Sequence, residues 1–228
     1  MNTQIAIIYI VVVVVSLTIH ETAHGYAAFR FGDLTAKNAG RLSLNPAVHL
    51  DFMGIVVFLI SMFAFGMPFG WAKPVPVDVM QLKNPKRDMV LVAFAGPLSN
   101  VLFALAIGFF ANLFLNSTFA SNFSAYNLSA YSIMVFVFYI TVQVNLGLAI
   151  FNLLPIYPLD GFRVLTGILP IEYAKKFAEA TRYAPHVMLG IIVLERVIHY
   201  PILSQIFSFV FNPWFSFWGK VIGGKFIG

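Results

Sequence analysis

Cysteine is absent from this 228-residue sequence, and charged residues are scarce. Without cysteine the chain has neither disulfides nor thiolate ligands, so any bound metal must be held by histidine, aspartate or glutamate. Only 10% of the residues are charged, whereas 60% are hydrophobic, and this balance lies far outside the range of ordinary soluble domains. The composition therefore indicates an integral membrane protein.

The net charge of +5 is spread over several loops instead of being gathered in one patch. Loops 30–50, 71–88 and 152–185 hold 11 lysine and arginine residues, and loop 116–130 holds none. This asymmetry predicts a multi-pass protein of the cell membrane with its basic loops in the cytoplasm, and no nucleic-acid partner. If residues 52–69 span the membrane, loop 30–50 moves outside and the asymmetry weakens.

The first apolar run, residues 5–19, contains no charge. A signal peptide needs a basic start and a small-residue cleavage site, and this run has neither, so we expect it to stay as a membrane helix. Continued to Phe31, it has about the 20 residues that a spanning helix requires.

An H-E-x-x-H motif, from His20 to His24, lies at the end of this run. Histidines four residues apart lie on one face of a helix, close enough for both imidazoles to bind one metal ion. Glu21 projects beside them and can accept a proton from water. The motif predicts a zinc hydrolase. The alternative is a helix with polar packing residues, which the cost of ionisable groups in an apolar helix disfavours.

A catalytic zinc site needs a third protein ligand and keeps one position for water. The candidates are His49, Asp51, Asp160, Glu172, His186 and His199. Asp160 follows two prolines directly after an apolar segment, where an unwound helix end can aim a carboxylate inward, and Gly161 permits a tight turn. An ordinary turn aspartate is the alternative at position 160.

Prolines interrupt the region between the first and third apolar stretches. Residues 52–69 are apolar, and the prolines of the following segment, Gly70 to Val77, forbid a helix and favour an extended chain. Extended backbone at membrane depth must be covered by protein or line a water-filled cavity. This region predicts either a re-entrant or short β element beside the metal, or a surface loop.

Further apolar segments lie at 89–115, 131–151, 187–198 and 202–218. We therefore predict an all-α polytopic membrane protein with about five to six membrane segments. The re-entrant or short β element would lie between the first and third of them. Since neither a repeat nor a change of composition divides the chain, residues 1–228 are expected to form a single membrane domain.

Two motifs, in this order, resemble the signatures of the site-2 protease family of intramembrane zinc metalloproteases. They are His20-Glu21-x-x-His24 and the stretch from Asn152-x-x-Pro155 to Leu159-Asp160-Gly161. Stretches 31–33, 40–46, 70–77 and 95–100 look like the compact bacterial and archaeal branch without a PDZ domain. The resemblance covers residues 19–163. Tyr157 is a departure, because a proline is expected there.

The resemblance implies one zinc ion held by His20, His24 and Asp160, with Glu21 as general base and acid. Zinc lowers the pKa of bound water toward ~7, so that hydroxide can attack a polarised peptide carbonyl. Asn152 is expected to donate a hydrogen bond to the oxyanion or to the unwound substrate, with capping of a helix end as the alternative.

The implied substrate is a transmembrane protein, cleaved in or near its membrane segment within the lipid bilayer. Because a membrane helix protects its own peptide bonds, the substrate must unwind, and segment 70–77 is a candidate to pair with it by strand addition. A secondary transporter is one alternative, although repeated segments are missing. A catalytically inactive zinc-binding membrane protein is another, which the intact Glu21 disfavours. The sequence indicates no oligomeric state.

Overall fold

A computed structural model describes residues 3–61, 70–198, 200 and 202–222. In this part of the chain the secondary structure is entirely helical. The α-helices are α1 (Thr3–Arg30), α2 (Thr35–Asn38), α3 (Phe52–Ile60), α4 (Pro85–Leu115), α5 (Thr118–Tyr126), α6 (Leu128–Leu153), α7 (Asp160–Ile168), α8 (Ile171–Thr181), α9 (Ala184–Ile198) and α10 (Ile202–Ile222). Two 3-10 turns, η1 (Pro46–Val48) and η3 (Val79–Gln81), complete the set. The all-α prediction is confirmed for the described residues.

Three of the described helices, α1, α4 and α6, are long and apolar enough to cross a membrane. The chain is therefore a membrane protein. The predicted count of about five to six segments is not confirmed. Helix α10 has 21 residues, but it is not apolar enough to count as a span. Helix α9 has 15 residues and extends only about 22 Å, less than the thickness of a hydrocarbon core.

The chain divides into two compact units, residues 1–100 and 101–228, and helix α4 contributes to both. The single domain expected from the sequence stays a prediction.

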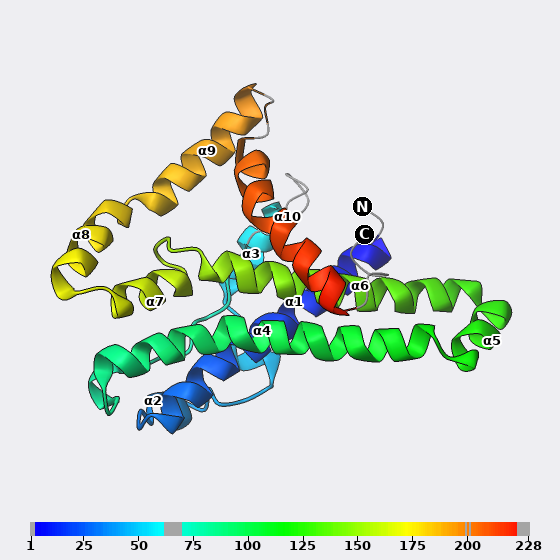
Figure 1. Cartoon of the computed structure of the whole chain (residues 1–228), viewed down its shortest axis with the longest axis horizontal. Helices are drawn as coiled ribbons and strands as arrows, with labels where there is room; N and C mark the ends of the chain where they lie inside the picture. The colour runs from blue at the N-terminus through cyan, green and yellow to red at the C-terminus, as the bar shows by residue number, and fades with distance from the viewer. Residues whose placement is uncertain (1–2, 62–69, 199, 201, 223–228) are drawn as a thin grey trace. The chain divides into compact units, whose positions relative to one another are not determined.

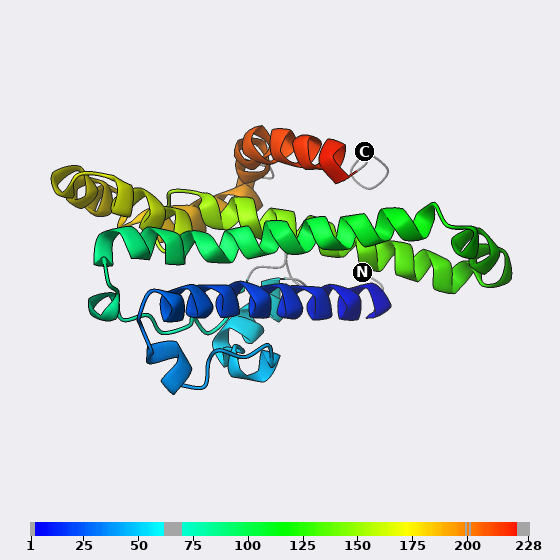
Figure 2. The ribbon, with the colours of Figure 1, turned by 60° about the horizontal axis from the view of Figure 1, so that its bottom comes forward.

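Helix α1 of the first unit buries small and polar residues and exposes large apolar ones. Ser16, His20, His24 and Ala28, which are four residues apart, are all buried. Val11, in contrast, is 54% exposed. This pattern suits a helix surrounded by lipid, in which small residues let other backbone segments approach. Figure 2 shows α2 and α3 on the same side of α1.

The region predicted to be re-entrant begins with α3, a nine-residue helix capped by Asp51, whose side chain accepts a hydrogen bond from the Gly54 amide. At about 13 Å, α3 alone is too short to cross a membrane. Residues 62–69 lie outside the described part of the chain, so the choice between a span and a re-entrant element stays open. Segment 70–77 is described, and it forms no β-strand with any other described residue.

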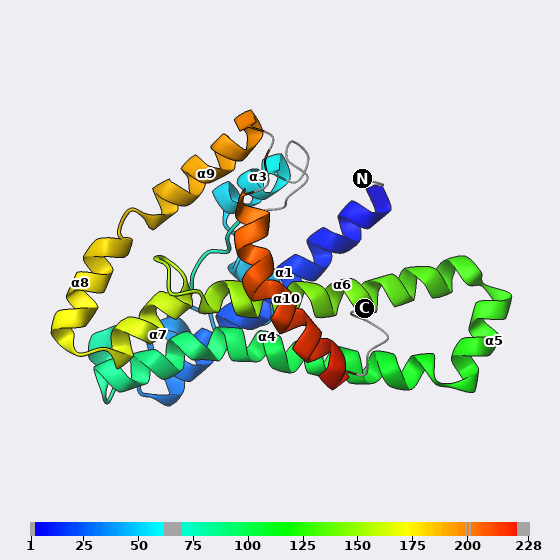
Figure 3. The ribbon, with the colours of Figure 1, turned by 45° about the horizontal axis from the view of Figure 1, so that its top comes forward.

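In the second unit, α5 links the end of α4 to the start of α6, as Figure 3 shows. The uncharged loop expected at 116–130 is therefore largely helical. Ser117 and Asn127 explain this, because their side chains cap α5 and α6 by accepting hydrogen bonds from the backbone amides of Ala120 and Ala130. Serine and asparagine are favoured at such positions.

A small hydrophobic core joins three helices of the second unit. It comprises Ala104, Val142, Leu146 and Ile222. The indole nitrogen of Trp214 on α10 donates a hydrogen bond of 3.0 Å to the Leu146 carbonyl on α6. Figure 1 follows the chain of this unit from α6 through α7, α8 and α9 to α10.

Gly161, the second residue of α7, allows the start of that helix to lie against the end of α6. A Cβ atom at position 161 would overlap the Leu153 carbonyl and lie 2.5 Å from the Leu154 carbonyl oxygen. The glycine is thus required by close approach to backbone, and no positive φ is recorded for it. Because of this close approach, the first turn of α7, which begins at Asp160, lies against the end of α6.

We expect Gly161→Ala to lower stability by about 1–3 kcal/mol, because the added methyl meets backbone atoms that cannot rotate away. Thermal unfolding of the purified protein in detergent measures this loss. Gly190→Ala on α9 is the matched control, since a Cβ there would meet no atom within 4 Å. Equal melting temperatures for the two variants would contradict the packing argument.

Candidate metal centre

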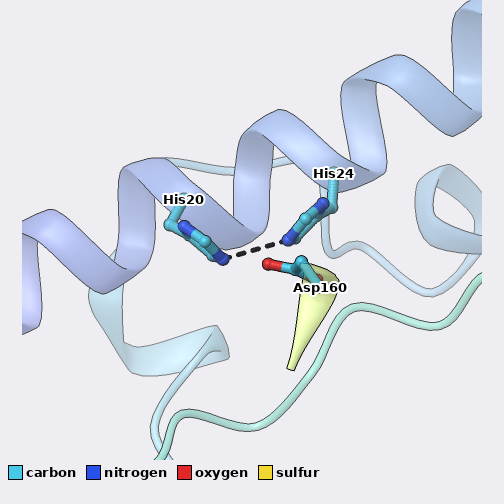
Figure 4. Close-up of side chains that lie close together, drawn as sticks. All are labelled: His20, His24 and Asp160. Atoms are coloured by element: carbon cyan, nitrogen blue, oxygen red, sulfur yellow. Dashed lines mark hydrogen bonds between the residues drawn. The ribbon is translucent and has the colours of Figure 1, made fainter. Parts of the chain in front are cut away.

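Helix α1 brings His20 and His24 together as their spacing predicts. Both side chains are buried, with exposed fractions of 4% and 8%. Their rings are nearly perpendicular, with centroids 4.6 Å apart. The two Nε2 atoms lie 3.0 Å from each other, as the dashed line in Figure 4 shows.

The other nitrogen of each imidazole faces a carbonyl oxygen. His20 Nδ1 lies 2.6 Å from Asn100 Oδ1, and His24 Nδ1 lies 2.7 Å from the Val92 carbonyl oxygen. The Asn100 amide is oriented by its own Nδ2, which donates to the Ser16 carbonyl at 3.3 Å. Since carbonyl oxygens only accept, both Nδ1 atoms carry the hydrogen and donate it.

It follows that the Nε2 atoms of the neutral rings carry lone pairs. Two such atoms at 3.0 Å repel each other unless a proton or a metal cation lies between them. With zinc–nitrogen distances of about 2.0–2.1 Å and tetrahedral geometry, two ligand nitrogens would be about 3.3 Å apart. His20 and His24 therefore fit a zinc ion, with their tautomers set in advance by partners on α4.

Helix α4 presents Val92, Gly96 and Asn100, spaced four residues apart, to the two imidazoles. A Cβ atom at Gly96 would overlap His24 Nε2 and lie 2.6 Å from His24 Cε1 and 2.7 Å from His20 Cε1. Only glycine leaves room for the rings at this position. Gly96 and Asn100 were not among the site residues predicted from the sequence. Their G-x-x-x-N spacing, which places both on one helix face, could have indicated that they lie at the same site.

Glu21 is half-buried on the same helix. Its Oε2 accepts a hydrogen bond of 2.8 Å from the backbone amide of Val75. The carboxylate next to the histidines is thus held by the extended segment that the prolines predict.

The second unit carries the other two predicted site residues. Asp160 is the first residue of α7 and is buried. Asn152 lies near the end of α6, where its Nδ2 donates to the Leu148 carbonyl at 3.0 Å. That bond lies within α6 and tests neither the oxyanion role nor the capping alternative, so the roles of both residues remain predictions.

The other candidate ligands have different surroundings. His49 is buried, with its Nε2 2.8 Å from the Ser43 carbonyl oxygen. Asp51 caps α3 and also accepts a hydrogen bond from the indole of Trp71. Glu172 and His186 lie on α8 and α9, and His199 lies outside the described residues.

An apolar helix that carries H-E-x-x-H, with both histidines oriented by a neighbouring helix, defines a membrane metallopeptidase centre. Residues 8–194 match peptidase family M50, the site-2 protease family, and the chain belongs to that family.

Its relatives include YwhC of Bacillus subtilis, named a zinc metalloprotease, with 38% identity over 90% of this chain and 92% of the relative. Another is Rip2 of Mycolicibacterium smegmatis, also named a zinc metalloprotease, with 27% identity over 90% of this chain and 71% of the relative. The zinc metalloprotease MJ0392 of Methanocaldococcus jannaschii is 24% identical over 82% of this chain and 41% of its own. No solved structure matches. The chain is a metalloprotease, and its metal is zinc.

We expect Gly96→Ala to weaken zinc binding at least about tenfold, because the methyl group displaces the imidazole edges that hold the metal. Zinc per chain, measured by atomic emission after dialysis against graded chelator, tests this. Gly147→Ala on α6 is the control, since its Cβ would meet only Phe215 Cζ at 3.9 Å, an ordinary van der Waals contact. Similar zinc retention in both variants would refute the role of Gly96.

Asn100→Leu removes the acceptor that orients His20, and we expect about 10–100-fold weaker zinc binding. Asn100→Asp keeps an oxygen at that place and should retain most of the affinity. A competition titration with a chelating dye compares the two variants. The orientation argument fails if leucine and aspartate have the same effect.

Proposed function

We propose that this metalloprotease is an intramembrane endopeptidase, which hydrolyses peptide bonds in or near the transmembrane segments of membrane-protein substrates. The supporting observation is the position of the histidine pair on α1, a helix that is long and apolar enough to cross a membrane. At 1.5 Å per residue, His24 and His20 lie about 9–15 Å along the helix from Arg30, its last residue. With Arg30 at the membrane surface, the motif lies below it, within the hydrocarbon region.

The proposed zinc ligands are His20, His24 and Asp160, which Figure 4 draws. Each of the three buried residues offers one ligand atom to a metal ion. Two imidazoles and one carboxylate form a donor set of catalytic zinc sites, which leaves a position for water. When bound, zinc polarises the scissile carbonyl and acidifies the attacking water.

Glu21 acts as general base and then as general acid. Its carboxylate takes the proton from the attacking water and returns it to the leaving amine nitrogen. Asn152 assists by stabilising the oxyanion or the unwound substrate strand. The Asn152 amide nitrogen carries two hydrogens, of which one is engaged by the Leu148 carbonyl, so the second can be directed to the substrate.

The protein acts as a multi-pass component of the cell membrane, with the lipid bilayer around it and its basic loops in the cytoplasm. The three apolar helices support this placement, as does the exposure of large apolar residues such as Val11 and Leu102. Buried small residues and exposed large apolar ones are typical of helices in lipid. We also propose that α4, which contributes to both compact units, makes residues 1–228 one domain.

Glu21→Gln removes the base while leaving both histidines in place, so we expect zinc binding of about one ion per chain and a loss of cleavage of about 10²–10⁴-fold. The assay incubates wild type and variant in detergent with a panel of single-span membrane proteins and follows the fragments by mass spectrometry.

Glu172→Gln, at an exposed position on α8, is the matched control and should cleave like the wild type. A wild type that binds zinc but cleaves nothing in the panel would instead favour the inactive zinc-binding protein. Undiminished cleavage by Glu21→Gln would exclude Glu21 as the base.

A further inference from the structure

The hydrogen bond from Val75 to Glu21 joins residues that are 54 positions apart in the chain. It is the main-chain amide of Val75, and not a side chain, that donates to Glu21 Oε2, at 2.8 Å. A glutamate side chain has three rotatable torsions, and a fixed donor restricts them. The contact can therefore determine where the carboxylate lies before a substrate arrives.

The local sequence singles out this donor. Pro74 and Pro76 flank Val75 and have no amide hydrogen. Lys73 and Val75 use their amides on one edge of the extended chain, toward His49 and Glu21. Since alternate residues face opposite edges, the other edge lacks donors at both prolines. That edge is poorly suited to pair with a substrate by strand addition, which depends on main-chain hydrogen bonds.

Residues 73–78, called the strap below, are anchored on both sides of Val75. The Lys73 amide donates to the His49 carbonyl at 2.8 Å, and Arg41 Nη2 donates to the Lys73 carbonyl at 2.7 Å. Beyond Val75, the Asp78 amide donates to Asp33 Oδ2 at 2.8 Å. These bonds connect the strap to residues 33–49, the region that follows α1. The Val75 amide is therefore held in a fixed position.

Helix α1 has room for the strap because of Gly25. The Val75 side chain is buried. A Cβ atom at position 25 would lie 3.0 Å from Val75 Cγ1 and 2.7 Å from Leu42 Cδ2, so any larger residue would push the strap away. The glycine after His24 thus permits the approach of Val75 that the hydrogen bond to Glu21 needs.

We propose that the main-chain amide of Val75 is a positioning group, which orients the Glu21 carboxylate for proton transfer. The inference rests on the proposed role of Glu21 as general base. Preorganisation of this kind lowers the reorganisation required during reaction, so its loss reduces kcat and leaves KM largely unchanged. In this proposal the strap acts on the proposed base.

The direct test replaces Val75 by α-hydroxyisovalerate, which converts the amide into an ester and removes the N–H. The side chain stays that of valine, and the Pro74 carbonyl, which accepts a long hydrogen bond of 3.4 Å from Arg41 Nη2, becomes a weaker acceptor. With a single-span protein that the wild type cleaves, we expect kcat to fall about 10–100-fold, with KM and bound zinc unchanged. Wild-type kcat in this ester, or a loss of zinc that accounts for the lost activity, would overturn the inference.

The same ester at Val77 is the matched control, with an identical side chain on the same segment. Within the described part of the chain, the Val77 amide makes no hydrogen bond, so its kcat should remain close to that of the wild type. An equal loss of kcat at both positions would show a general weakening of the segment and would overturn the specific role of Val75.

Hydrogen exchange offers a second test that uses only ordinary variants. The peptide from Lys73 to Val77 has three amide hydrogens, because its two prolines have none. Glu21→Gln keeps an acceptor oxygen, whereas Glu21→Ala removes it, so the Val75 amide should exchange at least about tenfold faster in the alanine variant. Equal exchange in the two variants would refute the contact.

The two proposals fail in different ways. If the proposed function is wrong, the wild type cleaves no protein of the panel, and if only the role of Glu21 as base is wrong, Glu21→Gln cleaves as fast as the wild type. If only the present inference is wrong, Glu21→Gln is inactive while the Val75 ester retains full kcat.

Discussion

The hydrogen bonds at the Nδ1 atoms of His20 and His24 are the constraint on which the rest of the centre depends. Imidazoles inside an apolar helix are costly unless every polar atom has a partner. Asn100 and the Val92 carbonyl supply these partners at 2.6 and 2.7 Å, and in the neutral imidazoles they leave the lone pair on Nε2. Gly96 between them is then required, because the rings occupy the volume where a side chain would lie.

The Glu21 carboxylate, the proposed general base, is also oriented by a hydrogen bond from a distant part of the chain. Glu21 is held by one backbone amide from a segment that His49, Arg41 and Asp33 anchor on both sides of that amide. Two different structures thus orient neighbouring residues of α1: a helix orients the two histidines proposed as metal ligands, and an extended chain orients the proposed base. Orientation by surrounding groups is what metal-assisted proton transfer needs from the protein.

Membrane residence explains why these contacts involve glycine, serine and asparagine. In lipid, helix association gains little from burying large apolar residues, so small residues and hydrogen bonds between helices contribute most. Large residues on α1, such as Val11, are exposed accordingly. The prediction of about five to six membrane segments depended on apolar composition, and only three described helices meet the length and hydropathy of a span. Helix length depends on caps and chain reversals, which apolarity does not specify.

By itself, the sequence determined the membrane class, the helical character and the H-E-x-x-H centre. These features are local: composition is summed along the chain, and the spacing of His20 and His24 defines one helix face. Only the tertiary structure decided which groups hold His20 Nδ1, His24 Nδ1 and the Glu21 carboxylate. These partners lie 80, 68 and 54 residues away in the chain, respectively. Such contacts depend on how distant segments pack, and a backbone amide or carbonyl carries no residue-specific signal that a sequence motif could reveal.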